Sequence, residues 1–262
     1  MNMITKGLIV DTETGGLDSR VNPLLSISLI AFQTSPMQIV DDFHLKILPP
    51  PGTLLQIPVD PEATSYTPKI AHLVDEQGNV YACSERGDPL DESLFSRKVI
   101  QFGACRVNGF SWETWRGQAV PLDQADASFK KFIDAWFDTA PVAYAHNADF
   151  DEKFVRAYFP STHAAIAQPW LCTMKMYQKY LKDRKEKGSA KLGELARRAN
   201  SDPSSPAYGT LKGPGIDIIS KAHDAAADTK MCFAALQWLA TQLSPHAVFP
   251  AKVLAPDEHP DD

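Results

Sequence analysis

Residues 141–159 read PVAYAHNADFDEKFVRAYF, a short apolar run followed by a polar turn and an amphipathic segment. The apolar residues at 141–145 predict a buried strand, and the apolar residues spaced three and four apart after it predict a helix. Only His146 and Asn147 separate the two. A strand that runs directly into a helix is a building unit of α/β proteins, so this stretch indicates that class.

Three β-rich stretches precede this unit, at residues 6–10, 24–32 and 39–48. Their connections are short, which favours an antiparallel meander. Apolar spacing predicts helices at 122–137 and 225–242, and residues 170–199 show the order strand, helix, loop, helix. The sequence therefore predicts antiparallel strands first and strand-helix units afterwards.

Prolines interrupt the pattern after residue 48, and two hairpins are predicted beyond them, at 70–83 and 99–116. The second contains Asn108-Gly109, a strong signal for a two-residue turn. Residues 200–217, rich in Pro, Gly and Ser, predict a mobile connection. The simplest division is a single domain over 1–243 with an insertion at about 49–98, followed by a disordered tail at 244–262.

The composition is that of a globular protein: 262 residues, 44% hydrophobic and 22% charged, with a net charge of −6. This acidic balance excludes nucleic-acid binding through bulk positive charge. No cysteine pair has the C-x-x-C spacing of a zinc site; the four are Cys83, Cys105, Cys172 and Cys232. The apolar run at residues 7–10 is too short for a signal peptide, and the run at 24–32 is half a membrane span. We expect a cytoplasmic protein with no membrane partner.

Asp11 and Glu13 lie two positions apart at the end of the first predicted strand, so both carboxylates leave the same face. Two neighbouring carboxylates repel each other unless a cation lies between them, and hard oxygen ligands suit a divalent ion. The motif alone is weak, because Asp60 and Glu62 have the same spacing among prolines.

Two further clusters, His146 to Asp151 and His223 to Asp228, each place an aspartate five residues after a histidine at a predicted helix start. In this interpretation Asn147 and Asp224 are the N-caps, each aspartate lies in the first helical turn, and each histidine precedes its helix. Taken singly, each cluster is better explained by helix capping than by catalysis. The combination of all three motifs favours a functional site.

The motifs DTETGGL at 11–17, HNADFD at 146–151 and HDAAAD at 223–228 resemble those of the DEDDh 3′–5′ exonucleases. Relatives in that family include the proofreading subunit of bacterial DNA polymerase III, ribonuclease T and oligoribonuclease. The resemblance implies a ribonuclease-H-like mixed sheet, antiparallel in its first three strands and parallel afterwards, flanked by helices. An insertion of hairpins and loop distinguishes this chain from compact members.

By this resemblance, four carboxylates hold two divalent metal ions, Mg²⁺ or Mn²⁺: Asp11, Glu13, Asp151 and Asp228. His223 matches the general base, and His146 is left with hydrogen bonds at the strand-to-helix corner. The resemblance also places Gly15, Gly16 and Leu17 against the terminal nucleotide, for which a plain turn is the alternative.

The implied function is hydrolysis of phosphodiester bonds from single-stranded DNA or RNA 3′ ends, releasing 5′-mononucleotides. The alternatives are a catalytically idle binding or scaffold domain of the same fold and an endonuclease of ribonuclease-H type. The insertion leaves open a homodimer or a partner bound through it. Residues 171–200 carry nine basic and three acidic side chains, either as a solvated helix face or as a phosphate track.

Overall fold

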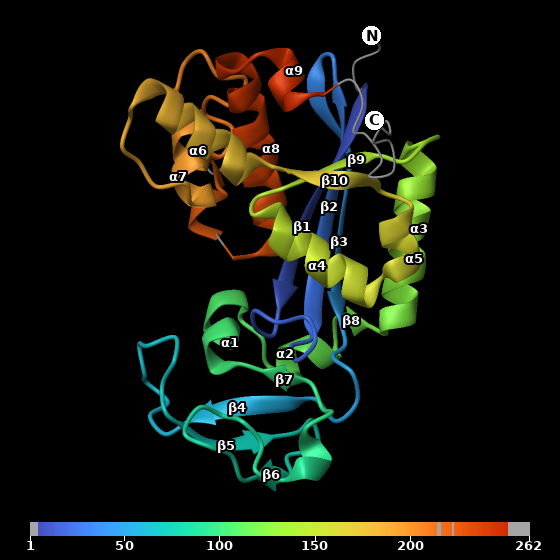
Figure 1. The fold of residues 1–262 in the computed structure, drawn as a ribbon, viewed down its shortest axis with the longest axis vertical. Coiled ribbons are helices and arrows are strands. Elements are labelled where there is room, and N and C mark those ends of the chain that lie inside the picture. Colours follow the sequence, from blue (N-terminus) through green and yellow to red (C-terminus); the bar gives the residue numbers. More distant parts are fainter. Residues whose placement is uncertain (1–4, 214–215, 222, 251–262) are drawn as a thin grey trace, which may run out of the picture. The chain divides into compact units, whose positions relative to one another are not determined.

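A computed structural model of the chain describes residues 5–213, 216–221 and 223–250. Its main sheet has six strands in the order β10-β9-β1-β2-β3-β8 (Figure 1). These strands are β1 (Lys6–Thr14), β2 (Leu24–Thr34), β3 (Met37–Ile47), β8 (Ala119–Val120), β9 (Val142–Ala145) and β10 (Ala167–Cys172). Helices flank this mixed sheet, which confirms the predicted α/β class.

The first three strands form the predicted meander. Strands β2 and β3 are separated by two residues, a connection that only antiparallel neighbours allow. At opposite ends of the β1–β2 pair, Thr34 donates to the carbonyl of Thr5 and Gly15 to that of Pro23, which is antiparallel register. Strand β9 then pairs with β1 in parallel, and β10 with β9 in parallel.

The helices of the second half agree with the predicted pattern. Helix α3 (Leu122–Trp136) and helix α8 (Ala225–Gln242) occupy the segments expected from apolar spacing. Between them lie α4 (Ala148–Tyr158), α5 (Pro160–Ala164), α6 (Thr173–Arg184) and α7 (Leu192–Ser201). None of the helices in the described ranges has the length and apolar content that a bilayer crossing requires.

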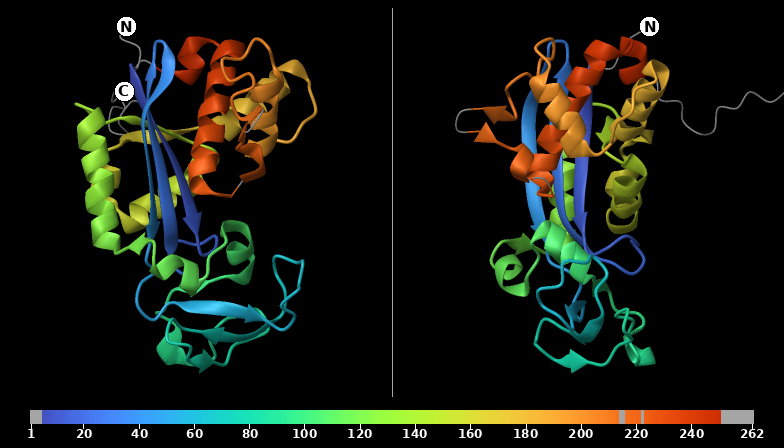
Figure 2. Two further views of the ribbon diagram at one scale, coloured as in Figure 1. Left: turned by 180° about the vertical axis from the view of Figure 1, so that it is seen from behind. Right: turned by 90° about the vertical axis from the view of Figure 1, so that its left-hand side faces the viewer.

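Helix α8 is buried against the sheet on one side and against α6 and α7 on the other (Figure 2). Ile9 and Tyr144 of the sheet share a cluster with Phe233 of α8. Trp238 of α8 is 1% exposed and packs edge-on against Tyr180 of α6. Burial of aromatic side chains of this size holds α8 between the sheet and α6.

The chain divides into two compact units. Unit 1 comprises residues up to 11, 28–44 and from 128 onwards, and unit 2 comprises 12–27 and 45–127. Unit 2 has a sheet of order β6-β5-β4-β7, made of β4 (Leu54–Pro58), β5 (Ile70–Val74), β6 (Val80–Tyr81) and β7 (Val99–Ile100). Strands β5 and β6 are the hairpin predicted at 70–83, and a 3₁₀ turn, η1, follows at Glu92–Leu94.

The second predicted hairpin is wrong. Residues 99–116 form strand β7 and then two short helices, α1 (Phe102–Asn108) and α2 (Trp112–Arg116). Gly109, with φ of 68°, ends α1 by donating to the carbonyl of Cys105. A helix that ends in a left-handed residue and a two-residue hairpin both use a residue with positive φ, so Asn-Gly fits either.

The described residues of this segment, 200–213 and 216–217, have more structure than the predicted mobile connection. Strands β11 (Lys212–Gly213) and β12 (Ile216–Asp217) pair, a 3₁₀ turn η2 (Ile219–Lys221) follows, and Ala207 and Leu211 are buried beside α8. The predicted tail also begins in order, with helix α9 (Pro245–Val248) and a buried Phe249. The rest of that tail, 251–262, lies outside the described residues.

Candidate functional site

The carboxyl ends of three parallel strands bring separate sequence motifs to one edge of the sheet. Ile9 of β1 is paired with Tyr144 of β9, so Asp11 and His146 each lie two residues beyond that pair. Cys172 of β10 is paired with Ala145, which places Thr173 next to His146. The first and second motifs therefore meet through strand register alone.

His146 is held on both sides of its ring. Its Nδ1 lies 3.0 Å from the hydroxyl of Thr173, and its Nε2 lies 2.8 Å from the carbonyl oxygen of Ala190. Because a carbonyl only accepts, Nε2 carries the proton and Nδ1 accepts from Thr173. Burial lowers the pKa of His146, which favours this neutral form. The resemblance left His146 with hydrogen bonds where β9 ends and α4 begins, and these two bonds are of that kind.

Helix α8 starts with the predicted cap. The side chain of Asp224 accepts from the backbone N–H of Ala227 at 3.0 Å. His223 precedes the cap in a left-handed conformation with φ of 72°, and its backbone N–H lies 3.3 and 3.2 Å from the two carboxylate oxygens of Asp228. Its side chain is exposed. Asp228 is thus tied to the segment just before its own helix.

A second anchor holds the start of α8. The hydroxyl of Thr229, the residue after Asp228, lies 3.0 Å from that of Ser28 on β2. Both side chains are buried. This bond links the first turn of α8 to the neighbour of strand β1, and it fixes the height of Asp228 along the sheet.

At the start of α4 the prediction holds in part. Asn147 is the N-cap residue, but it has φ of 71° and its side chain caps no helical N–H group. The left-handed backbone turns the amide away, because side-chain capping requires an extended N-cap residue. Asp151 lies in the first turn as expected and is 3% exposed.

Three of the four predicted carboxylates come together. Asp11, Glu13 and Asp228 each offer an oxygen, and the three oxygens lie within 4.8 Å of one another. Among the described residues, this group does not include Asp151. Asp151 and Asp11 are nevertheless neighbours of the same buried thiol, because both raise the pKa of Cys232 in addition to the effect of its burial. Asp151 therefore acts electrostatically on the same thiol as Asp11, while the three-oxygen group itself consists of Asp11, Glu13 and Asp228.

The electrostatics of this group suit a cation. Burial raises the pKa of Asp228 to about 7; nearby Asp224 acts in the same direction, and the N–H of His223 opposes the rise. Without a cation the carboxylate is poorly solvated in its ionised form. An all-carboxylate donor set is the type that Mg²⁺, Mn²⁺ or Ca²⁺ prefers, so the residues fit a hard divalent ion.

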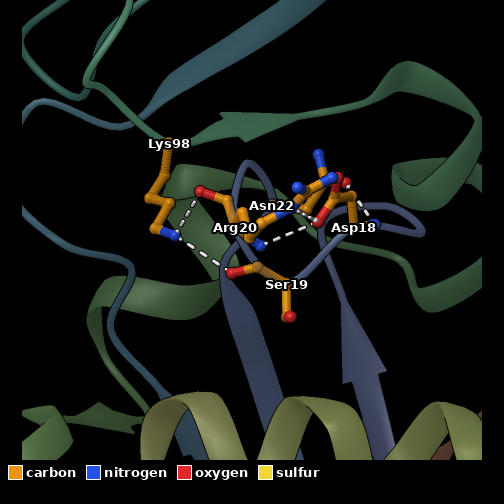
Figure 3. A network of polar contacts seen from close by, with 5 residues as sticks. All are labelled: Asp18, Ser19, Arg20, Asn22 and Lys98. Atoms are coloured by element: carbon orange, nitrogen blue, oxygen red, sulfur yellow. Dashed lines mark hydrogen bonds and ion pairs between the residues drawn. The ribbon is translucent and has the colours of Figure 1, made fainter.

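Residues 15–22 form a tightly held loop after β1. Figure 3 shows Lys98, whose Nζ donates to the carbonyls of Ser19 and Arg20 at 3.1 and 2.7 Å. The amide of Asn22 accepts from the backbone N–H of Asp18 at 2.9 Å. Leu17 stands out from this loop with 74% of its surface exposed.

The two glycines of this loop are required by packing. A Cβ atom on Gly15 would lie 2.6 Å from Cδ of Pro23, and one on Gly16 would lie 2.6 Å from the amide of Asn22. Packing within the loop is therefore a third reason for glycine at these two positions, beside close approach of a nucleotide and a plain turn.

We expect Gly15→Ala to lower the free energy of unfolding by about 1–3 kcal/mol, because the added methyl group overlaps Pro23 and Ile100. Gly117→Ala is the matched control, since nothing lies within 4 Å of its Cβ position. Urea denaturation of both variants measures the difference. Equal stability of the two variants would contradict the packing role of Gly15.

Sequence reasoning missed three contributions to the site: the hydroxyl of Thr173, the carbonyl of Ala190 and the Ser28–Thr229 bond. Each joins residues that are far apart in the chain. Only the alternating serines of β2 are unusual in sequence, because Ser26 and Ser28 interrupt an otherwise apolar buried strand. A buried hydroxyl requires a partner, and for Ser28 that partner is the α8 start.

Comparison with known proteins gives the fold. No family model matches the chain, and no curated protein matches it. Solved structures of Escherichia coli exonuclease I do match. Its complex with a 5cy-dT13 oligonucleotide has a TM-score of 0.54 at 16% identity, over 93% of this chain and 42% of that one. The zinc-bound form of its single-stranded DNA complex has a TM-score of 0.52 at 16% identity, over 94% and 42%.

The chain therefore has the mixed α/β, ribonuclease-H-like fold that the motifs implied. The particular fold it matches is that of the corresponding part of E. coli exonuclease I. This chain spans about 42% of the length of the exonuclease I chains that it matches.

Proposed function

We propose that the chain is a metal-dependent 3′–5′ exonuclease that hydrolyses phosphodiester bonds from the 3′ end of single-stranded DNA or RNA and releases 5′-mononucleotides. One observation carries this proposal: Asp11, Glu13 and Asp228, from motifs more than 200 residues apart, present oxygens within 4.8 Å of one another. The matched exonuclease I structures, several of them complexes with oligonucleotides, support the same kind of chemistry.

In this proposal four carboxylates hold two Mg²⁺ or Mn²⁺ ions: Asp11, Glu13, Asp151 and Asp228. When bound, the ions would activate a water molecule and neutralise charge on the scissile phosphate and the leaving 3′ oxygen. The buried position of Asp151 and Asp228 keeps their oxygens fixed. His223 accepts the proton of the attacking water, and the bond from its backbone N–H to Asp228 holds this residue at the start of α8.

Residues 15–17 meet the terminal nucleotide in this proposal. The exposed side chain of Leu17 packs against the last base, and the backbone of Gly15 and Gly16 lies along its sugar. Residues 1–243 act as one exonuclease domain, and the insertion at 49–98 serves a homodimer contact or a partner. We place the protein in the cytoplasm, where its cysteines remain free thiols.

The test is hydrolysis of 3′-labelled and 5′-labelled DNA and RNA oligonucleotides with and without Mg²⁺ or Mn²⁺. We expect loss of a 3′ label as mononucleotide first, and gradual shortening of 5′-labelled strands. Cleavage of a circular strand would instead indicate an endonuclease. An absence of hydrolysis together with no metal binding by calorimetry would indicate an idle binding domain.

A further inference from the structure

The end of α6 and the start of α7 are joined by a segment rich in exposed cations. We call residues 182–191 the basic loop; five of its ten residues have positively charged, exposed side chains, namely Lys182, Arg184, Lys185, Lys187 and Lys191. Arg184 lies over the ring of Tyr180 at 4.8 Å. The basic loop carries the highest density of positive charge within residues 171–200.

Elsewhere in 171–200 the cations are neutralised. Four ion pairs account for them: Lys175 with Asp149, Lys179 with Asp183, Arg197 with Glu194, and Arg198 with Glu186. Those pairs support the solvated-face interpretation for that part of the segment.

The basic loop differs, because its own acids, Asp183 and Glu186, pair with Lys179 and Arg198 outside it. Within the described part of the chain, no ion pair is formed by Lys182, Lys185, Lys187 or Lys191.

The basic loop is fastened to the candidate metal site. The carbonyl of Ala190, next to Lys191, accepts the Nε2 proton of His146 at 2.8 Å. His146 in turn occupies the strand end beside that of Asp11. This bond spans 44 residues of sequence and holds the end of the basic loop close to the acids that would receive a phosphodiester.

Lys185 occupies a position that usually belongs to glycine. It has φ of 56° at the end of α6, where its N–H and that of Glu186 cap the last helical carbonyls. A left-handed lysine is less stable than glycine there by about 1 kcal/mol. The charge at this position is therefore kept at a cost in stability, as at other functional positions with unfavourable backbone.

We propose that the basic loop binds the sugar-phosphate backbone of a single strand upstream of its 3′ end, with His146 as the positioning residue. The inference rests on the proposed function, which brings the 3′ end to the neighbouring acids. It also reconciles a net charge of −6 with a polyanionic substrate, because the contact is local. An acidic polypeptide is the competing occupant.

The test measures binding of a fluorescein-labelled dT20 oligonucleotide in EDTA, where no hydrolysis interferes, at several KCl concentrations. The test variant replaces Lys182, Lys185, Lys187 and Lys191 with Gln. Each phosphate contact contributes about 0.7 to the slope of log Kd against log salt concentration, so loss of four contacts should lower this slope by about 2–3. At low salt, Kd should rise at least about tenfold. The control variant carries the same charge change elsewhere, at Lys69, Arg86, Lys130 and Lys131.

An unchanged salt slope, or an equal loss in the control variant, would overturn the inference. Displacement of dT20 by polyglutamate at equal charge concentration would also overturn it in favour of an acidic polypeptide. Metal-dependent hydrolysis by the unmodified protein is assayed in parallel. If hydrolysis persists while the salt slope is unchanged, only the inference fails; if dT20 is neither bound nor cleaved, both fail.

Single substitutions at Lys185 and His146 distinguish an effect on strand binding from an effect on the stability of the fold. Lys185→Gly should raise the melting temperature, because glycine suits the left-handed position, and should still lower the salt slope by about 0.7. His146→Ala should raise KM for an oligonucleotide more than it lowers kcat, and His146→Gln, which retains a side-chain N–H, should restore part of the KM. The proposal would be contradicted if Lys185→Gly left the salt dependence of Kd unchanged. It would also be contradicted if His146→Ala lowered kcat and left KM unchanged.

Discussion

Replacement of Asp228 with asparagine is expected to reduce metal-dependent hydrolysis by about a thousandfold or more, and yet to stabilise the metal-free protein. The first effect follows because the variant replaces one of the three clustered carboxylates with an uncharged amide, which is a much weaker ligand for a divalent ion. A thousandfold loss corresponds to about 4 kcal/mol of transition-state stabilisation, a reasonable share of what bound divalent ions supply.

The second effect follows from the raised pKa of Asp228, about 7, which burial causes. An aspartate in the unfolded chain titrates near 4, so between about pH 4 and pH 7 the folded chain holds a proton that the unfolded chain has lost. Stability of the metal-free protein therefore falls as the pH rises through this window, and the loss persists above it. Asparagine has the shape of the protonated form and avoids this loss.

The measurement is thermal unfolding in EDTA and in Mg²⁺. At pH 8 in EDTA we expect Asp228→Asn to melt about 5 °C or more above the unmodified protein, and below pH 4 we expect no difference. Mg²⁺ should raise the melting temperature of the unmodified protein but not that of the variant. Asp224→Asn is the matched control, since it removes the same charge four residues earlier and keeps a good N-cap. Equal behaviour of the two variants would contradict the assignment of Asp228.

Much of the main sheet and of the helices beside it could be predicted, because the apolar patterns of these segments were strong. Helix α8 begins and ends at the predicted residues, where Asp224 caps an apolar run. Errors arose where one local signal serves two structures. Asn108-Gly109 provides the positive φ of a helix end as readily as that of a hairpin, and a single sequence does not distinguish them.

The identity of the acids in the candidate site could be predicted from the sequence, whereas the hydrogen bonds that position the site could not. Asp11 and Glu13 are two residues apart on one strand, so their common face follows from strand geometry. The bond from His146 to Ala190 depends on the path of the chain after α6, which no local pattern specifies. The same is true of Lys185, whose left-handed conformation is unusual for lysine.

His223 gives the second large effect. We expect His223→Gly to lower kcat by about 100-fold to 10,000-fold, the range for loss of a general base, without weakening metal binding. Metal binding should survive because His223 contacts Asp228 through its backbone N–H, which glycine keeps. Glycine also tolerates the φ of 72°, so the local fold should remain.

Added imidazole provides the decisive measurement for His223. The side chain is exposed, so a free imidazole molecule can reach the position that the ring has left. We expect imidazole to restore hydrolysis by His223→Gly several-fold and to restore none in Asp228→Asn, whose defect is the loss of a negatively charged metal ligand. A His223→Gly variant that hydrolyses oligonucleotides at the full rate would remove His223 from the reaction. A variant that is slow, binds Mg²⁺ normally and shows no response to imidazole would assign it a structural role, because a proton acceptor supplied from solution would then have made no difference.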